Sequence, residues 1–354
     1  MGSFSAEAFP TIALDEAAGE LVLVDQTLLP NEKKLLRLSK QEDIWEALHT
    51  LRVRGAPAIG VTAALAMALA ARDIETEDYS VFEKRFNEAA DYLASSRPTA
   101  VNLFWALDRM RGVTAAHRGE AVARAKALLL EEAKKIREED IAVCKAIGEN
   151  ALTLVRKGDG LLTHCNAGRL ATVEYGTATA VMYLGHERDY GFRIYCDETR
   201  PLLQGARLTA FELSEAGMRP TVLCDNMSAS LLETGAVNAV FTGCDRVAAN
   251  GDSANKIGTQ LLALAAKRYG VPFYICAPTS TIDMKAASGA DIPIEQRKPE
   301  EVTEMWYERR MAPEGVSAYN PAFDVTPADL ITAIVTEHGV LRPPYTQSIS
   351  GLGL

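Results

Sequence analysis

The sequence has few cysteines, and their spacing matches no redox or zinc-binding motif. Six cysteines occur in 354 residues, and no two of them form a Cys-x-x-Cys pair or a set with zinc-ligand spacing. Several lie inside apolar runs, where a free cysteine behaves as a small buried hydrophobic residue. The pattern excludes a disulfide framework and is typical of a reducing compartment, so we expect a cytoplasmic protein.

The sequence also has fewer basic than acidic residues. The chain has 37 Lys and Arg against 47 Asp and Glu, a net charge of −10. Since binding to phosphate backbones or anionic membranes needs a basic face, we expect no nucleic-acid partner and no membrane partner. We see no basic, apolar leader at the N-terminus. The longest uncharged stretch, 55–71, is short for a membrane span and predicts a buried helix.

Familiar cofactor and metal motifs are missing from the sequence. It contains no Gly-x-Gly-x-x-Gly, no P-loop, no His-Glu-x-x-His and no Gly-x-Ser-x-Gly. No carboxylate set has metal-ligand spacing either. We therefore expect chemistry that uses neither a metal nor a cofactor, and an anion would be bound by a few placed groups.

The second half alternates apolar runs with helical patterns, which predicts an α/β fold with a mostly parallel, Rossmann-like sheet covered on both faces. The expected strands are 160–165, 192–198, 221–226, 239–245 and 272–278, and the expected helices are 170–185, 205–216, 228–235 and 255–269.

The first half is mainly helical by its periodicity. Short strands and turns are expected in 1–30, and helices in 40–51, 58–72, 79–95, 100–112 and 118–156, the last as one long helix or two abutting ones. We expect a helical N-terminal domain with short strands at 1–125 and a Rossmann-like catalytic domain at 126–354.

Polar and reactive residues collect where the predicted strands end. The ends include His164-Cys165-Asn166 and Cys244-Asp245. In an open parallel sheet, ligands bind outside the carboxyl ends of the strands. Cys165 is thus placed to face a cleft, although its spacing alone fits a buried cysteine equally well.

Four turns offer candidate ligand-binding groups. Asn255 is a possible cap for a helix beginning near Lys256, and a helix N-terminus beside a lysine binds anions. Arg54 precedes Gly55 and a helix whose first turn would hold Pro57. Arg97 and Gln204 also lie just before predicted helices. Each of these residues, taken alone, fits an ordinary solvated loop or surface position.

Four long stretches together resemble one family. They are "RGAPAIG" (54–60), "THCNAG" (163–168), "DETRPLLQGARLTAFEL" (197–213) and "GCDRVAANGDSANKIGT" (243–259). They are similar to the methylthioribose-1-phosphate isomerase family, over about Asp25 to Pro344. That family is shared with ribose-1,5-bisphosphate isomerases and with regulatory subunits of a translation-initiation exchange factor. The regulatory subunits do not have the catalytic Cys/Asp combination.

The resemblance implies a homodimer that isomerises 5-methylthioribose 1-phosphate to 5-methylthioribulose 1-phosphate in methionine salvage. Alternatives are isomerisation of ribose 1,5-bisphosphate or 5-deoxyribose 1-phosphate, or a non-catalytic, sugar-phosphate-sensing subunit. By position, Cys165 and Asp245 are the implied catalytic pair. The sugar-phosphate site would be lined by Arg54, Gly55, Ala56, Arg97, Gln204, Asn255 and Lys256.

The chemistry of the substrate explains why an acid is needed. The phosphate on the anomeric oxygen prevents simple ring opening, so an acid must protonate the ring oxygen. We expect Asp245 to be that acid, with its pKa raised by burial. Cys165 would act as a base toward C2 or stabilise developing charge, and a hydride shift is a second possible route. A thiol ionises readily beside a cation or a helix terminus, and we expect the turn 166–168 to provide a helix end.

Overall fold

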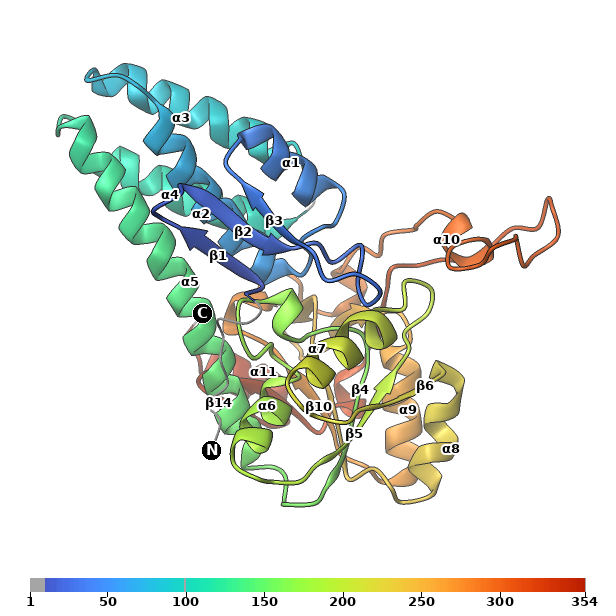
Figure 1. Cartoon of the computed structure of the whole chain (residues 1–354). Helices are drawn as coiled ribbons and strands as arrows, with labels where there is room; N and C mark the ends of the chain where they lie inside the picture. The colour runs from blue at the N-terminus through green and yellow to red at the C-terminus, as the bar shows by residue number, and fades with distance from the viewer. Residues whose placement is uncertain (1–9, 99, 354) are drawn as a thin grey trace. The chain divides into compact units, whose positions relative to one another are not determined.

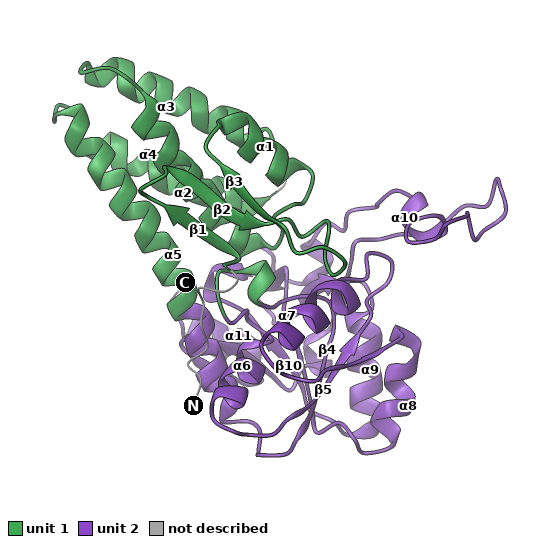
Figure 2. Cartoon of the chain, viewed as in Figure 1, with its two compact units in different colours: residues 1–142, 169–174 green, residues 143–168, 175–354 purple. Residues whose placement is uncertain are grey.

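The computed structural model describes residues 10–98 and 100–353, which form two compact units (Figures 1 and 2). Unit 1 comprises residues 1–142 and 169–174, and unit 2 comprises 143–168 and 175–354. The division falls inside one long helix, α5 (Val122–Leu152), which is the first of the two expected forms of this region, one helix or two abutting ones. The expected domain boundary near residue 125 stays a prediction.

Unit 1 packs helices against a small antiparallel sheet of order β1-β2-β3. The strands are β1 (Ile12–Asp15), β2 (Glu20–Val24) and β3 (Leu35–Leu38), and the other helices are α1 (Gln41–His49), α2 (Ala56–Asp73), α3 (Tyr79–Ala94) and α4 (Val101–Ala116). The helices and the strands β1 and β2 match the expected elements, whereas β3 lies beyond the expected strand region 1–30. Residues 1–9 of that region lie outside the described residues.

Helix α2 is the centre of unit 1. Every residue from Ala58 to Ala71 is buried, and the small side chains let α4 pack closely against it. By length and composition α2 is apolar enough to cross a membrane, but 78% of that window is buried inside the protein. The expected buried helix is therefore confirmed.

Unit 2 contains a seven-stranded sheet of order β14-β13-β10-β7-β4-β5-β6. All pairs are parallel except β13 with β14. The strands are β4 (Gly160–Thr163), β5 (Arg193–Asp197), β6 (Thr221–Leu223), β7 (Ala239–Thr242), β10 (Phe273–Cys276), β13 (Ala333–Thr336) and β14 (Gly339–Leu341). All five expected strands are confirmed, and β13 and β14 were not anticipated.

Helices cover both faces of this sheet, as expected for a Rossmann-like fold (Figure 1). Leu161 packs on one face with the end of α5 and with α6 (Ala180–Glu187) and α7 (Ala210–Glu215). Its neighbour Leu162 packs on the other face with α8 (Ser228–Glu233), α9 (Thr259–Tyr269) and α11 (Tyr345–Ser350). Continuous apolar strands are required because successive side chains enter opposite cores.

The expected helix at 170–185 is wrong over its first half. Only a short 3₁₀ turn, η2 (Arg169–Ala171), precedes α6. Tyr175 and Gly176 have φ angles of 63° and 74°. Two consecutive residues in the left-handed region cannot continue a right-handed helix, so α6 begins only at Ala180.

The expected helix at 255–269 begins later than predicted because its first residues form a strand. A second sheet of order β11-β8-β9-β12 contains β8 (Arg246–Ala248), β9 (Ser253–Lys256), β11 (Ile282–Asp283) and β12 (Phe323–Thr326). Asn255 pairs with Asp324 in the register of β9 and β12. Helix α9 therefore begins at Thr259, after the strand has ended.

Candidate active site

Cys165 lies two residues beyond the end of β4 in a constrained backbone conformation. Its φ is 65°, which is uncommon for a residue with a side chain. Two threonine hydroxyls hold it there. The Cys165 N–H donates to Thr199 Oγ1 at 2.8 Å, and Thr209 Oγ1 donates to the Cys165 carbonyl at 2.6 Å. Such strain is characteristic of functional sites, where the surrounding structure fixes a reactive side chain.

Asp245 follows β7, which is the neighbour of β4 in the parallel sheet. Both predicted catalytic residues therefore lie at the carboxyl edge of the sheet, after adjacent strands, as expected. The loops that carry them touch. Gly243 stands against Ala167 so closely that a Cβ on Gly243 would lie 2.4 Å from the Ala167 Cβ.

Asp245 is exposed to solvent, although nearby protein atoms partly desolvate its carboxyl group. Desolvation raises its pKa, and the positive charges of Arg246 and Lys256 offset part of that effect. The raised pKa of Asp245 favours the protonated form that a general acid needs.

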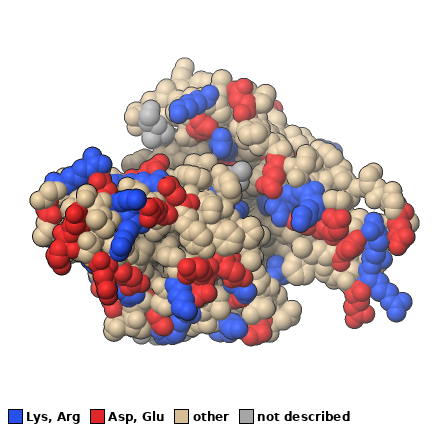
Figure 3. Space-filling view, turned by 90° about the horizontal axis from the view of Figure 1, so that it is seen from above, with Lys and Arg blue, Asp and Glu red and all other residues tan. Residues whose placement is uncertain are grey.

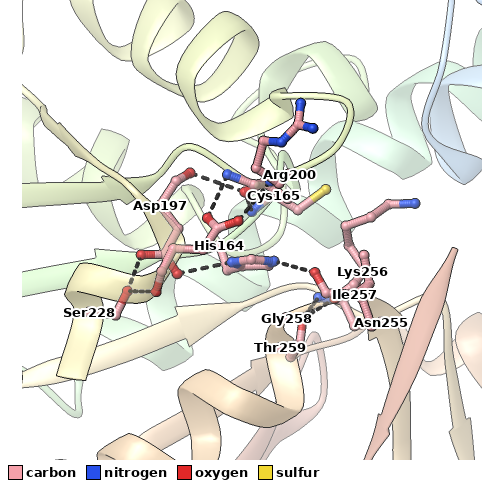
Figure 4. A network of polar contacts seen from close by, with 12 residues as sticks. His164, Cys165, Asp197, Arg200, Ser228, Asn255, Lys256, Ile257, Gly258 and Thr259 are labelled. Atoms are coloured by element: carbon pink, nitrogen blue, oxygen red, sulfur yellow. Dashed lines mark hydrogen bonds and ion pairs between the residues drawn. The ribbon is translucent and has the colours of Figure 1, made fainter. Parts of the chain in front are cut away.

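His164, which precedes Cys165, is buried, and both of its ring nitrogens have a hydrogen-bonding partner (Figure 4). Its Nδ1 lies 2.9 Å from Asp197 Oδ2, and its Nε2 lies 2.8 Å from the Ile257 carbonyl oxygen. Asp197 also accepts the Ser228 hydroxyl at 2.5 Å. The ring thus joins β4, β5 and the turn after β9. The sequence analysis noted His164 only as part of a polar strand end, and Asp197 only as the first residue of the stretch 197–213.

The ligand atoms of His164, Asp197 and Asp225 lie within 4.8 Å of one another, a spacing that also fits a metal site. However, both imidazole nitrogens face acceptors, and the two Asp225 oxygens accept the Thr199 and Arg200 N–H groups at 2.7 Å each. Since a metal ligand must offer a free lone pair, these residues form a hydrogen-bonded network instead.

The predicted capping of helix α9 by Asn255, and its predicted start near Lys256, are wrong. Gly258, with φ 101°, occupies the N-cap position, and Asn255 in β9 donates to Thr259 Oγ1 at 3.0 Å. The Asp324 carboxylate accepts the Gly258 and Gln260 N–H groups at 2.8 and 3.1 Å. A protein carboxylate therefore already occupies the helix terminus that we expected a phosphate to use.

Lys256 lies near Asp245, although no helix begins at Lys256. It lies at the end of β9, and the preceding Ala254 carbonyl accepts the Asp245 N–H at 2.9 Å. The Lys256 ammonium donates to the Ala322 carbonyl at 3.0 Å and lies 4.5 Å from the centre of the Phe323 ring. Asn255 and Lys256 therefore share a strand with the main-chain partner of Asp245.

Among the predicted binding residues, Gln204 has a buried side-chain oxygen that could accept a hydrogen bond from a ligand. It precedes a π-helical turn, η3 (Gly205–Thr209), that leads into α7, so a helix follows it as expected. Its side chain is 6% exposed, and within the described residues its Oε1 accepts no hydrogen bond. Because a buried amide oxygen without a donor is unfavourable, a ligand hydroxyl would satisfy it.

The other predicted binding residues belong to unit 1. Gly55 caps α2 with φ 94°, and Pro57 lies in the first turn, as expected. A Cβ on Gly55 would lie 2.5 Å from the Ala171 Cα, so only glycine fits there. Arg54, Ala56 and Arg97 are partly exposed, and Arg97 lies in the turn before α4.

The expected helix end beside Cys165 is absent from the described residues. The residues after Gly168 form only the three-residue turn η2, and α6 begins at Ala180. A single 3₁₀ turn has too few aligned peptides for a significant dipole. His164, which precedes Cys165 in the chain, has an acceptor opposite each of its two ring nitrogens.

Comparisons with known proteins give the family of this chain. Residues 52–343 match the family described as "Initiation factor 2 subunit family". A methylthioribose-1-phosphate isomerase of Symbiobacterium thermophilum is 60% identical over 341 residues, covering 96% of this chain and 95% of that protein. A 5-deoxyribose 1-phosphate isomerase of Petrotoga mobilis is 54% identical over 341 residues, covering 96% and 98%.

A solved structure also superposes on nearly the whole chain. It is 5-methylthioribose 1-phosphate isomerase from Pyrococcus horikoshii, with a TM-score of 0.94, 42% identity, and coverage of 98% of this chain and 96% of that one.

Proposed function

Since this chain belongs to the Initiation factor 2 subunit family, we propose that it is the isomerase that converts 5-methylthioribose 1-phosphate to 5-methylthioribulose 1-phosphate. The observation that carries the proposal is the placement of Cys165 and Asp245 after adjacent strands, at one edge of the sheet. A non-catalytic sensing subunit would not need this pair. The reaction would form part of methionine salvage.

In the proposed mechanism Asp245 protonates the ring oxygen while its bond to C1 breaks. The Cys165 thiolate takes the C2 proton and leaves an enediol that still carries the phosphate on C1. Cys165 then returns a proton to C1, and Asp245 recovers its proton from the C2 hydroxyl as the ketone forms. Both side chains end in their starting state, and all atoms balance. Gln204, Asn255, Lys256, Arg54 and Arg97 would bind the hydroxyls and the phosphate.

A hydride shift from C2 to C1 would give the same product without Cys165 acting as a base. Running the reaction in deuterium oxide distinguishes the two routes. Deuterium at C1 of the product supports the enediol route, although fast return of the original proton would reduce it. Complete retention of the C2 hydrogen in C165S as well as in the unmodified enzyme would favour the hydride shift.

The substrate proposal is tested by turnover. The purified protein should be assayed with 5-methylthioribose 1-phosphate, 5-deoxyribose 1-phosphate and ribose 1,5-bisphosphate at equal concentrations. We expect the highest kcat/KM for the first. A higher value for 5-deoxyribose 1-phosphate would instead favour the activity named for the Petrotoga mobilis relative. No turnover of any of the three would favour the regulatory alternative.

The proposal includes a cytoplasmic homodimer with no nucleic-acid or membrane partner. Leu261 and Leu264 on α9 are 61% and 49% exposed, and exposed apolar side chains on one helix suit a partner subunit. On the face drawn in Figure 3, basic side chains are interspersed with acidic ones, so that face has no broad basic area. Light scattering of the unmodified protein and of L261E tests the dimer.

A further inference from the structure

His164 is a buried histidine beside Cys165 whose two ring nitrogens both face acceptors. The side chain has no exposed surface, and that of Asp197 is 2% exposed. The Ile257 carbonyl can only accept, so Nε2 carries a proton. Asp197 Oδ2 accepts from Nδ1 when the carboxyl group is ionised. A neutral imidazole has one N–H and cannot serve both partners, whereas an imidazolium can.

The surroundings of the ring favour its charged form. Acidic groups face it from β5 (Asp197), from the turn after β6 (Asp225) and from β12 (Asp324), and Cys165 adjoins it. Burial alone lowers the pKa of His164. The hydrogen bond and charge of Asp197, together with the charge of Asp225, outweigh burial and raise this pKa to about 9. This direction agrees with the two acceptors that face the ring nitrogens, and both favour the imidazolium.

The space around the ring is also fixed. Gly258 has a φ of 101°, and a Cβ there would lie 2.8 Å from His164 Cε1. A side chain at 258 would displace the ring from its contact with Ile257. Through this contact the ring connects the Cys165 turn to the Asn255–Lys256 segment directly before Ile257 (Figure 4).

We propose that His164 is a positioning residue of the isomerase, an imidazolium held by Asp197 and Ile257 that keeps a positive charge beside Cys165 and fixes the Cys165 turn against the Asn255–Lys256 segment. The proposal rests on the proposed catalytic role of Cys165. The His164 imidazolium would provide the cation that a reactive thiol needs, in place of a helix end, which the described residues lack beside Cys165. Asp197 is then the counterion of His164.

Asp197→Asn separates the charge from the hydrogen bonds. In D197N the amide can donate to Nδ1 while Nε2–H still donates to Ile257, so a neutral ring fits. Without its counterion, the buried ring should lose its proton at or below the ordinary histidine value of about 6.5. We expect the ratio of kcat in D197N to kcat in the unmodified enzyme to fall about tenfold between pH 6 and pH 8. Asp189→Asn, on an exposed turn, should keep a ratio near one.

A ratio that does not change with pH would mean that Asp197 matters only for structure, and the proposal would be overturned. Equal activity of D197N and the unmodified enzyme at pH 8 would overturn it too. Thermal unfolding at both pH values checks that the variant is folded. The ¹⁵N chemical shifts of labelled histidine in the unmodified protein give an independent readout. Both His164 nitrogens should carry protons at pH 7.5, with H164Q used for assignment.

Alkylation reports on Cys165 without catalysis. At pH 8 the rate of iodoacetamide labelling at Cys165, followed by mass spectrometry of its peptide, should fall about tenfold in D197N and in H164Q. His186→Gln, at an exposed position, is the matched control. Unchanged labelling in a folded D197N would refute a charge effect of His164. Full activity of C165S would refute the role of Cys165 itself, while leaving the histidine shifts as predicted.

Discussion

Gly243 and Ala167 are in direct contact, two residues from Asp245 and two from Cys165 respectively, and a Cβ on Gly243 would lie 2.4 Å from the Ala167 Cβ. This contact sets how closely the turns after β4 and β7 approach. Gly243→Ala should separate the turns and cost about 1–3 kcal/mol in overpacking. We expect a lower kcat, because the acid and the thiol would move apart.

Gly112→Ala is the matched control for this change. Gly112 lies in the exposed middle of α4 with no atom near its missing Cβ. The substitution should leave kcat unchanged and stabilise the protein by up to about 1 kcal/mol. Steady-state kinetics and thermal unfolding of both variants provide the measurement. Normal kcat in Gly243→Ala would show that the spacing of the turns tolerates change.

Asp245→Asn keeps the shape of the side chain and removes its acid proton. We expect kcat to fall on the order of 10²–10⁴-fold with little change in KM. C165S should also fall sharply. Because both residues act on one reaction, the double variant should be little worse than the worse single variant.

A ring-opened substrate analogue tests the division of roles between Asp245 and Cys165. It bypasses protonation of the ring oxygen, so it should rescue D245N more than C165S. Near-normal turnover of D245N on the natural substrate, or equal rescue of both variants, would contradict the assignment of Asp245 as the acid.

Gln204→Met removes the buried Oε1 that accepts no hydrogen bond within the described residues. Replacing an unsatisfied amide by an apolar side chain of similar size should stabilise the unliganded protein by about 1 kcal/mol. The same change should raise KM by about tenfold, because the substrate loses a partner. Opposite effects on the melting temperature and on KM would identify Gln204 as a ligand group. A loss of stability with unchanged KM would mark it as structural.

Arg54→Ala should weaken binding of the sugar phosphate by about 2–4 kcal/mol, the scale for removing one partner of a buried charge pair. Arg54→Lys should lose less, because it keeps the charge and loses only the two-pronged geometry. Isothermal titration with the product, or with an inert analogue, gives the affinities. Equal affinity in all three proteins would return Arg54 to the role of a solvated surface residue.

Asp140 is predicted to make stability depend on pH. Desolvation raises its pKa to about 7, and its Oδ2 accepts the Val173 N–H at 2.8 Å. In the unfolded chain an aspartate titrates near 3.9. The folded protein therefore binds more protons than the unfolded chain between those values, and its stability falls as pH rises through that range.

Asp140→Asn removes this dependence and can still accept from Val173. Relative to the unmodified protein, D140N should gain about 1–3 kcal/mol in free energy of unfolding on going from pH 5 to pH 8. Chemical denaturation at the two pH values measures the gain, with Asp189→Asn as control. An advantage that is the same at both pH values would show that Asp140 does not titrate in this window.

Much of the fold was set by local patterns in the sequence. The apolar runs after residue 160 predict the strands because each residue enters a core on one face or the other, and this pattern is readable without knowing the partners. Cys165 and Asp245 could be placed at one sheet edge because parallel strands share the direction of their ends. The helices of unit 1 could be predicted from their periodicity for the same local reason.

Only the tertiary structure decided what surrounds those two residues. Asp324 takes the N-terminus of α9 through a hydrogen bond to Gly258, 66 positions earlier. His164 donates to Ile257, 93 positions later. Both contacts depend on how β9 pairs with β12, and this strand pairing overrides the helix-capping signal at Asn255. Sequence periodicity reports which face of an element is buried, but not which distant group it meets. The sequence therefore predicted the candidate pair Cys165 and Asp245 and the sheet edge that carries it, while long-range pairing determined the charges and hydrogen bonds around that pair.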